Sequence, residues 1–222
     1  MSAIITMRSL SRSHAKSSKS GMTLVEIIIT MTISLILVTS VLSFYIQFYK
    51  IGFVNEQRNR INRDIRQLTS ELTRAGKQAN DFFIYNSIAN SDRDTPADRR
   101  LDGSSGDLLI LTYNADSTGQ LTEQIVGYYR LADSADADAL GPLLRFTVTF
   151  NPASDLPVEQ LIPDQDLLPN QDMVVELSKG LSEGHLFYNF LGKTIMLNGQ
   201  IFHGNNAKRV TETYNYSISP RG

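Results

Sequence analysis

The chain has 222 residues, three histidines, no cysteine and a formal net charge of −2 at pH 7. Without cysteine it has no disulfides, no thiol chemistry and no cysteine-based metal site. The small net charge hides two oppositely charged regions, and these limit the kinds of partner that the chain can bind.

The charges are divided between a basic stretch and an acidic one. Residues 50–77 hold seven basic and three acidic residues, whereas residues 81–222 hold ten basic and nineteen acidic ones. An acidic domain argues against nucleic acid as a partner, because neutralisation of phosphates supplies most of the non-specific affinity for it. The basic stretch fits a solvated helix face, contact with lipid headgroups, or contact with the acidic faces of sister subunits.

The start of the chain is basic and polar, and an apolar run follows it. Residues 1–21 contain four basic residues and no acidic one. Then comes the sequence Gly21-Met22-Thr23-Leu24-Val25-Glu26, followed by an uncharged apolar run over residues 27–46. About 20 apolar residues span the hydrocarbon core of a bilayer, so this run predicts a transmembrane helix.

Glu26 is the exception in this apolar segment. A carboxylate at that depth costs at least about 2.5 kcal/mol unless it is paired, so Glu26 needs a cationic partner. Cleavage after Gly21 would create one, because the new α-amino group of Met22 would lie about one helical turn from Glu26. That amino group belongs either to the same chain or to a neighbour.

The order of these residues resembles the class III signal of type IV pilins and of type II secretion pseudopilins, with Met22 where Phe is more usual. The resemblance implies that a prepilin peptidase cuts between Gly21 and Met22 and methylates the new N-terminus, and that Glu26 is required for assembly. It also implies a single-pass inner-membrane protein with a cytoplasmic leader and a periplasmic globular domain. The implied partners are other pseudopilins or minor pilins, the inner-membrane assembly platform and membrane lipid.

Two other interpretations of the N-terminal segment remain. An ordinary secretory signal has an apolar region of about 7–15 residues and a small-residue cleavage site behind it. The run here is longer and no such site follows. A plain signal anchor fits the length and the positive-inside charge, but it explains neither Glu26 nor Gly21.

The helical pattern continues beyond the apolar run. Apolar residues recur at helical spacing at Ile51, Val54, Ile61, Ile65, Leu68, Leu72 and Ala75, and no proline occurs before Pro96. The pattern predicts a helix from Met22 to about Gln78, with residues 22–48 in the membrane or filament core and 49–80 as an amphipathic continuation. Gly76 is a candidate for its end. Ile61, Ile65, Leu68 and Leu72 are expected to pack on a sheet of the following domain.

Residues 81–222 are β-rich, so the predicted fold class is α+β, with the long helix packed on an antiparallel sheet. Three runs joined by turn signals predict a meander: 107–113, 123–131 and 143–150. Further strand candidates are 82–85, 173–177, 186–190, 194–197 and, as an edge strand, 209–218. Residues 151–170 contain four prolines and predict a surface insertion or loop rather than a central strand. Eight aromatic residues are predicted to be core residues and cross-strand pairs rather than a ligand platform: Phe82, Phe83, Tyr85, Tyr128, Tyr129, Phe187, Tyr188 and Phe190.

A second, more diffuse resemblance is to the J-type minor pseudopilins and related minor pilins. It rests on three strand patterns, and the matching residues are Asp107, Leu109, Leu111 and Tyr113, then Ile125, Tyr128 or Tyr129, and Leu131, then Leu144 and Arg145. The closing Ser219-Pro220-Arg221 has the same character.

No pattern in the sequence indicates catalysis or a cofactor. The histidines, His14, His185 and His203, lack the HExxH spacing, and there is no GxSxG, P-loop or GxGxxG motif. The acidic turn with Asp133, Asp136 and Asp138 lacks the glycine and the bidentate glutamate of an EF-hand, so a solvated loop is favoured over a calcium site, and the same holds for Asp164 and Asp166.

The sequence therefore predicts assembly rather than an enzyme. The favoured function is a structural minor pseudopilin of a type II secretion system, incorporated into a periplasmic pseudopilus. The alternatives are a minor type IV pilin that acts in pilus priming, adhesion or DNA uptake, and a single-pass envelope protein with a retained anchor.

Overall fold

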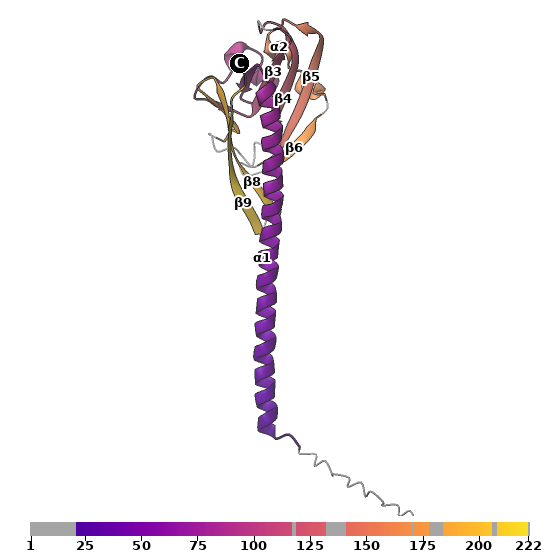
Figure 1. The fold of residues 1–222 in the computed structure, drawn as a ribbon, viewed down its shortest axis with the longest axis vertical. Helices are drawn as coiled ribbons and strands as arrows, with labels where there is room; N and C mark the ends of the chain where they lie inside the picture. The colour runs from indigo at the N-terminus through magenta and orange to yellow at the C-terminus, as the bar shows by residue number, and fades with distance from the viewer. Residues whose placement is uncertain are drawn as a thin grey trace, which may run out of the picture. The chain divides into compact units, whose positions relative to one another are not determined.

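The computed structural model describes residues 21–116, 119–131, 141–169, 171–177, 184–205 and 208–221. The chain forms two compact units, Met1–Ile51 and Gly52–Gly222, and each is described by itself. The helix α1 (Leu24–Gln78) contributes to both units (Figure 1).

In the first unit α1 is an apolar helix whose residues are all exposed. A window of 18 residues in it has a mean hydropathy of 2.4, so by length and composition it is able to cross a membrane. Its hydroxyl groups bond to backbone carbonyls one turn earlier: Thr32 Oγ1 donates to Ile28 O at 2.8 Å and Ser40 Oγ to Ile36 O at 2.8 Å. These bonds satisfy polar groups inside the helix, as a lipid environment requires.

In the second unit α1 is amphipathic and buries one stripe of residues. The buried residues are Gln57, Ile61, Leu68, Leu72, Ala75 and Gly76, and Ile65 packs half-buried beside them. Their spacing follows the helical period, so they share one face. The helix ends at Gln78, and the amide of Asn80 donates to Thr112 O at 2.9 Å, which brings the chain into the first strand.

Gly76 does not mark the end of α1, because the helix continues two residues beyond it. It is instead a point of close approach. A Cβ at this position would lie 2.6 Å from Cδ1 of Ile218 in the last strand, well inside van der Waals contact. The glycine therefore lets that strand rest directly on the helix.

The second unit has two antiparallel sheets rather than one. The five-stranded sheet has the order β1-β3-β4-β5-β6, and its strands are β1 (Asp81–Tyr85), β3 (Leu108–Asn114), β4 (Thr122–Arg130), β5 (Gly141–Ser154) and β6 (Asp172–Leu177). The four-stranded sheet has the order β2-β7-β8-β9, and its strands are β2 (Ser105–Gly106), β7 (Phe187–Phe190), β8 (Thr194–Asn205) and β9 (Lys208–Ile218). The predicted α+β class, the meander β3-β4-β5 and the edge position of the last strand are confirmed.

The main core lies between α1 and the two sheets. It joins Leu68 and Leu72 of α1 to Leu109 and Leu111 of β3 and to residues of the second sheet such as Leu197. Polar contacts fasten the same surfaces together. Thr69 Oγ1 lies 2.9 Å from the hydroxyl of Tyr214, where burial raises the pKa of the tyrosine to about 12. His203 Nε2 lies 2.6 Å from Asp64 Oδ2 and ties β8 to the helix.

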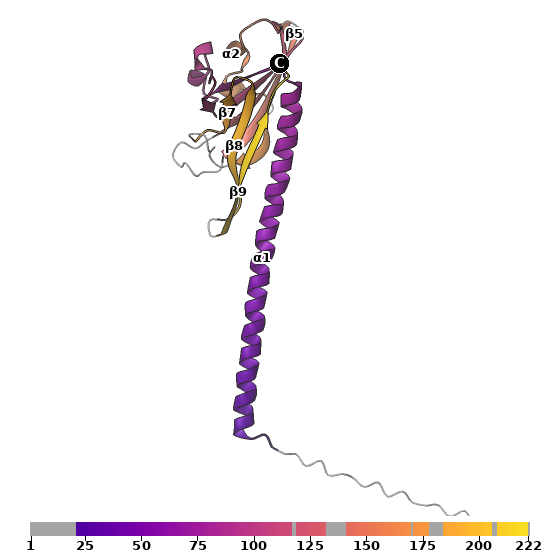
Figure 2. The same ribbon diagram turned by 60° about the vertical axis from the view of Figure 1, so that its left-hand side comes forward.

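A second core covers the opposite face of the five-stranded sheet. Leu108 and Ile110 alternate with the β3 residues of the main core, so they point away from α1. The short helix α2 (Val158–Leu161) packs over them, and Figure 2 shows α2 and α1 on opposite sides of the unit. Residues between 155 and 169 thus form an ordered cover, with Val158, Leu161, Ile162 and Leu168 buried.

A buried carboxylate anchors this cover. Arg99 Nε donates to Glu159 Oε1 at 2.6 Å, and the hydroxyl of Tyr85 donates to the same oxygen at 2.8 Å. Burial works against the ionised form, but the bonds from Arg99 and Tyr85 lower the pKa of Glu159 overall. The guanidinium of Arg93 donates to the carbonyls of Ile88 at 2.9 Å and Ile162 at 3.2 Å, which joins the loop after β1 to the cover.

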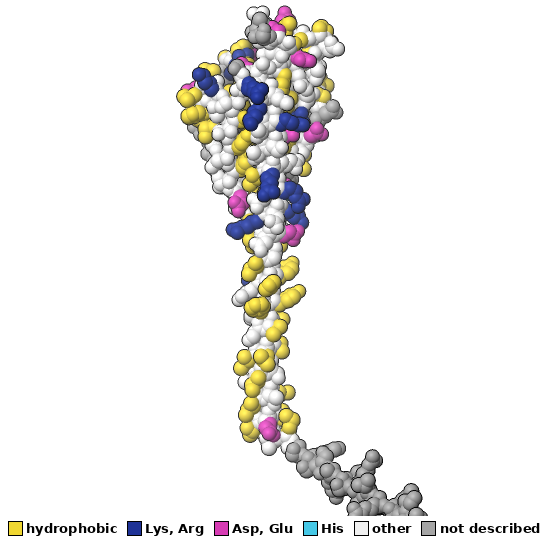
Figure 3. Space-filling view, in the orientation of Figure 1, with side chains coloured by type: hydrophobic (Ala, Val, Ile, Leu, Met, Phe, Trp, Pro, Cys, Tyr) yellow, Lys and Arg dark blue, Asp and Glu magenta, His cyan; other side chains and the backbone are white. Residues whose placement is uncertain are grey.

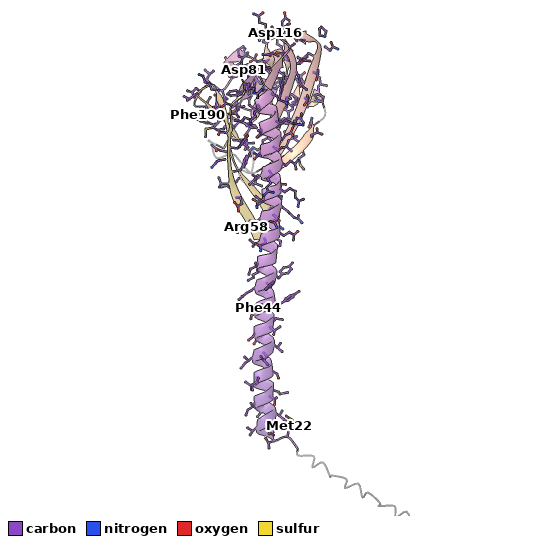
Figure 4. The ribbon with its side chains drawn as sticks, viewed as in Figure 1. Met22, Phe44, Arg58, Asp81, Asp116 and Phe190 are labelled. Atoms are coloured by element: carbon purple, nitrogen blue, oxygen red, sulfur yellow. The ribbon has the colours of Figure 1, made fainter. Side chains whose placement is uncertain are left out.

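The predicted loop over residues 151–170 is wrong for its first four residues, although they do not belong to a central strand. β5 runs on to Ser154, so residues 151–154 are strand and not loop. β6 pairs only with residues 141–145 of β5, so the far half of the strand is an edge, where Pro152 removes no ladder bond. Phe190 is 44 % exposed and lies outside both cores, because it ends β7 at a hairpin turn (Figure 4). It is paired with Thr194 of β8, which agrees with the prediction of core residues and cross-strand pairs.

We expect Leu68→Asp to destabilise the second unit by about 3 kcal/mol or more, because it buries an unpaired charge in the main core. The measurement is urea unfolding of the full chain in detergent. Asn62→Asp, on the exposed face of the same helix, is the matched control and should change the free energy of unfolding by less than about 0.5 kcal/mol. Equal effects of the two substitutions would show that α1 is not packed on the sheets.

The second prediction concerns a buried ion pair between Asp107, just before β3, and Arg130, the last residue of β4. Arg130 Nη2 lies 3.1 Å from Asp107 Oδ2, and the amide of Leu186 donates to Oδ1 at 2.9 Å. Burial disfavours the carboxylate, but His185, Arg130 and the Leu186 amide together hold the pKa of Asp107 below its usual value. Because the folded pKa is depressed, this group stabilises fully above its unfolded pKa of about 3.9, and the contribution is lost as pH falls through the folded pKa.

Asp107→Asn should therefore cost about 3–5 kcal/mol near neutral pH, since it leaves Arg130 buried without its counter-ion. The difference from wild type should begin to shrink below about pH 4 and vanish as pH falls through the lower folded pKa of Asp107, where the wild-type carboxylate in the folded protein also protonates. Unfolding free energies measured at both pH values test this, with the exposed Asp172→Asn as control. A difference that is independent of pH would rule out the ion pair as its cause.

Candidate processing and assembly site

A capping box opens α1. The helix begins at Leu24, and the amide of Glu26 donates to Thr23 Oγ1 at 3.3 Å while the amide of Thr23 donates to Glu26 Oε2 at 2.8 Å. The amide of Ile27 donates to Thr23 O at 3.2 Å, which closes the first turn. Reciprocal bonds of this kind satisfy backbone donors that a helix start otherwise leaves open. Thr23 and Glu26 therefore fix where the apolar helix begins.

The same bonds hold the Glu26 carboxylate in one orientation. Oε2 accepts from both the amide of Thr23, at 2.8 Å, and its hydroxyl, at 3.0 Å. Among the described residues, none donates to Oε1. The carboxylate is thus fixed by one oxygen and has the other available for a further donor.

Gly21 and Met22 precede this box in open surroundings. A Cβ at Gly21 would meet nothing within 4 Å, and Met22 is 64 % exposed. The described part of the chain therefore gives no steric reason for glycine at position 21. Figure 4 shows Met22 at the start of α1, and Phe44 farther along the same helix.

Aromatic side chains mark the other end of the apolar segment. Four of them are exposed just before Lys50, and they are Phe44, Tyr45, Phe48 and Tyr49. The rings of Phe44 and Phe48 lie 5.9 Å apart. Aromatic belts of this kind lie at membrane–water interfaces. From Glu26 to Tyr45 the helix rises about 28 Å, close to the thickness of a hydrocarbon core.

Residues 16–42 match the family model described as the prokaryotic N-terminal methylation motif. The chain carries a class III prepilin signal, like that of type IV pilins and pseudopilins. No curated protein and no solved structure matches this chain. The prepilin signal makes the chain a pilin-like protein processed by a prepilin peptidase, and its apolar helix is consistent with a pilin anchored in the inner membrane.

The predicted site residues fall into two places. Gly21, Met22 and Glu26 of the prepilin signal lie within the first turn of α1 and just before it. Ile61, Ile65, Leu68 and Leu72 lie in the second unit, where all but the half-buried Ile65 are buried in the main core. The two sets therefore have separate roles.

Sequence reasoning missed the part played by Thr23. The signal was present, because Thr23 and Glu26 have the S/T-x-x-E spacing of a capping box immediately before an apolar run. Of the candidate metal ligands, Asp133, Asp136 and Asp138 lie outside the described residues. Within the described ranges no three His, Asp or Glu side chains are arranged to hold a metal ion, and Asp164 Oδ1 accepts from Asn90 Nδ2 at 2.9 Å.

We expect Gly21→Val to block removal of the leader when the chain is produced with its prepilin peptidase. The chain itself has room for the side chain, so a block would arise in the active site of the peptidase. N-terminal sequencing of the membrane form measures the cut. Gly52→Ala, at a second glycine with open surroundings, is the control and should be cleaved like wild type. Cleavage of Gly21→Val at the wild-type rate would show that the peptidase does not select glycine here.

Proposed function

We propose that this chain is a minor pseudopilin of a type II secretion system. It is inserted in the inner membrane as a precursor, cut between Gly21 and Met22, and assembled into a periplasmic pseudopilus. The observation that carries the proposal is the fixed Glu26 carboxylate, whose Oε1 is open one helical turn from the position of the new Met22 amine.

The energetic argument concerns two charges in an apolar setting. A carboxylate and an ammonium group are each costly in hydrocarbon, and each loses most of that cost when they pair. Thr23 holds Glu26 in place, so an incoming amine meets an oriented acceptor and little side-chain entropy is lost. Helices that pack in any other register leave both charges unpaired, so the pair specifies the register of assembly.

The exposed apolar helix gives a second line of support. None of the apolar window of α1 is buried by other described residues. Such a surface needs either lipid or other helices around it. In a membrane-inserted precursor that later enters a helical bundle, this surface is first surrounded by lipid and then by other helices. A retained anchor needs only the lipid.

The residues that carry the J-type resemblance join the sheet to the helix. The hydroxyl of Tyr113 donates to Ala75 O at 2.9 Å, and the hydroxyl of Tyr128 donates to Glu71 Oε1 at 3.3 Å. Arg145 Nη1 lies 3.0 Å from the same Glu71 oxygen. These contacts support a subunit whose sheet is attached to the amphipathic half of α1 within the second unit.

The proposed partners follow from this role. They are the prepilin peptidase, other pseudopilins, the inner-membrane assembly platform and membrane lipid. Proteins with this signal are typically structural and not enzymes. Neighbouring genes for a secretion ATPase and a secretin would support the type II system, whereas a pilus retraction ATPase or competence genes would favour a minor type IV pilin.

Glu26→Leu should leave membrane insertion and leader removal intact but lower lateral association by at least about tenfold, because the neighbouring amine loses its counter-ion. Glu26→Asp should retain part of the association, and Glu26→Gln little, since Gln keeps the shape but not the charge.

Cross-linking between differently tagged copies through a single Ser43→Cys measures the association, because the chain has no other cysteine. Ser34→Leu is the matched control, since it also makes the helix more apolar without removing the carboxylate. Glu26→Leu protein that is cleaved and cross-links like wild type would refute the pairing.

A further inference from the structure

A row of basic residues runs along α1 on the side away from its buried stripe. Five exposed residues follow one another at spacings of 3, 4, 4 and 3 and therefore share one face of the helix: Arg63, Arg66, Ser70, Arg74 and Lys77. We call them the basic stripe. Arg66 and Ser70 are each two residues from the buried Leu68, a rotation of about 200°, so the stripe lies opposite the main core. In Figure 3 dark-blue side chains gather over the part of α1 that belongs to the second unit.

Most of the positive charge of the stripe has no counter-ion. Among the described side chains, no carboxylate lies within 4.0 Å of the cationic nitrogens of Arg63, Arg66 or Lys77. The helix dipole accounts for a cation in the last turn, such as Lys77, but not for Arg63 and Arg66 farther from the end. These two arginines therefore call for an anionic partner outside the chain.

The two acidic residues within the span of the stripe are drawn toward the sheets. Asp64 Oδ2 lies 2.6 Å from His203 Nε2 of β8. Glu71 Oε1 lies 3.0 Å from Arg145 Nη1 of β5, whereas Arg74 Nη2 is 3.5 Å from the other oxygen of Glu71. Both carboxylates thus make contacts within the second unit and leave the stripe cationic on its outer side.

An open groove of about 470 Å³ adjoins the C-terminal part of the stripe. Its lining is polar and cationic: Ser70, Thr73, Arg74, Lys77, Gln78 and Arg221. The amide of Arg221 donates to Ala79 O at 3.2 Å, which places the C-terminal segment beside the end of α1. Three cations with neighbouring hydroxyl groups form a surface suited to a carboxylate, because charge-assisted hydrogen bonds are stronger than neutral ones.

A second copy of this chain has no acidic row on α1 to offer the stripe. Of the described residues 52–78, Glu56 is the one exposed carboxylate, and it already lies 2.7 Å from Arg60. Two copies whose stripes face each other would bring cations together, and like-charge contact at an interface suppresses such a pairing. A helix that packs on this stripe therefore belongs to a different chain.

Lipid headgroups are another source of anionic groups. The first cation of the stripe, Arg63, lies 17 residues beyond Ile46, where the apolar run ends. The interfacial region on each side of a bilayer is about 5–8 Å thick, which about five helical residues span. The place of the stripe along α1 therefore favours a protein neighbour over lipid.

We propose that the basic stripe binds α1 of a different subunit, which carries Asp or Glu residues at matching spacings of three and four along its own helix. One such carboxylate occupies the groove between Arg74 and Lys77. The contact lets neighbouring helices stand side by side, and like-charge repulsion keeps a second copy from taking the same place.

This inference rests on the proposed function, because it assumes that subunits stand side by side through α1. It adds the chemical class of the neighbour. Charge complementarity sets partner choice more than total affinity, so the apolar halves of the helices supply the attachment and the stripe supplies the selection. Two copies of this chain are then held together through their apolar halves alone.

The test uses the full, leader-cleaved chain in membranes, with a charge-reversed copy in place of an acidic neighbour. That copy carries Arg63→Glu, Arg66→Glu and Lys77→Glu, so none of the ion pairs described above is broken. Every copy also carries Ser70→Cys in the middle of the stripe, and the chain has no native cysteine. A bismaleimide should join a native copy to a charge-reversed copy at least about tenfold faster than it joins two native copies or two charge-reversed copies.

Two controls assign the effect to the stripe. Lys50→Glu, Arg58→Glu and Lys193→Glu together reverse as much charge at exposed positions off the stripe, and this copy should cross-link to a native copy no faster than a second native copy does. Salt at about 1 M, where the Debye length is about 3 Å, should remove most of the advantage of the native and charge-reversed pair. Equal rates for all pairs, an equal gain from the off-stripe reversals, or a gain that persists at high salt would overturn the proposal.

The Ser43→Cys cross-link separates this inference from the proposed function. If that cross-link forms but the native and charge-reversed pair gains nothing at Ser70→Cys, the stripe contact is wrong and the assembly through α1 stands. If no Ser43→Cys cross-link forms in cleaved protein, the proposed function itself fails, and the stripe contact fails with it. A benzophenone on Ser70→Cys that labels only phospholipid in the mixed sample would also overturn the stripe contact, in favour of lipid.

Discussion

The structure depends first on one carboxylate in an apolar helix. Glu26 has two roles that reinforce each other. It caps the start of α1 through Thr23, which fixes the helix and the orientation of the carboxylate at once. It also leaves one oxygen open at a depth where an unpaired charge costs at least about 2.5 kcal/mol. A capped carboxylate does not need rearrangement before it receives an amine, so the capping box prepares the site for the amine that processing creates.

In the second unit the two faces of α1 have different roles. Its buried stripe packs on two sheets, and the exposed face keeps its charge for solvent or for partners. The five-stranded sheet has a core on each face, since alternate residues of β3 point to α1 and to the cover around α2. Because both faces of this sheet are buried, the cover around α2 is needed to shield one of them from solvent. Its anchoring carboxylate, Glu159, accepts hydrogen bonds from Arg99 at 2.6 Å and from Tyr85 at 2.8 Å.

The sequence was informative where a single physical requirement dominates. Helical periodicity and the lack of proline before Pro96 predicted α1 to within a residue or two of its end, and the alternation of β3, β4 and β5 predicted the meander. It was misleading where tertiary contacts decide. Gly76 resembles a helix stop but serves close packing against Ile218, a contact 142 positions away in sequence. Residues 151–154 resemble a loop because Pro152 is disfavoured in a central strand, and only the sheet order shows that this half of β5 is an edge.

At the prepilin signal, Gly21, Met22 and Glu26 were recognisable by type and order, whereas the role of Thr23 required the spacing of a capping box. Composition gave the basic residues of α1, and the structure shows that Arg63, Arg66 and Arg74 lie on its exposed face, away from the buried stripe.

The most direct test of the central claim is a distance between two atoms in assembled material. Protein in which the Met22 amine is labelled with ¹⁵N is mixed with protein in which the Glu26 carboxylate is labelled with ¹³C, after leader removal, and the assembly is examined by solid-state NMR. The account predicts a nitrogen–carbon contact of an ion pair, about 4 Å or less, between Met22 of one copy and Glu26 of another. An assembly that forms with Glu26 still bonded only to Thr23, and with no such contact in the mixed sample, would contradict it.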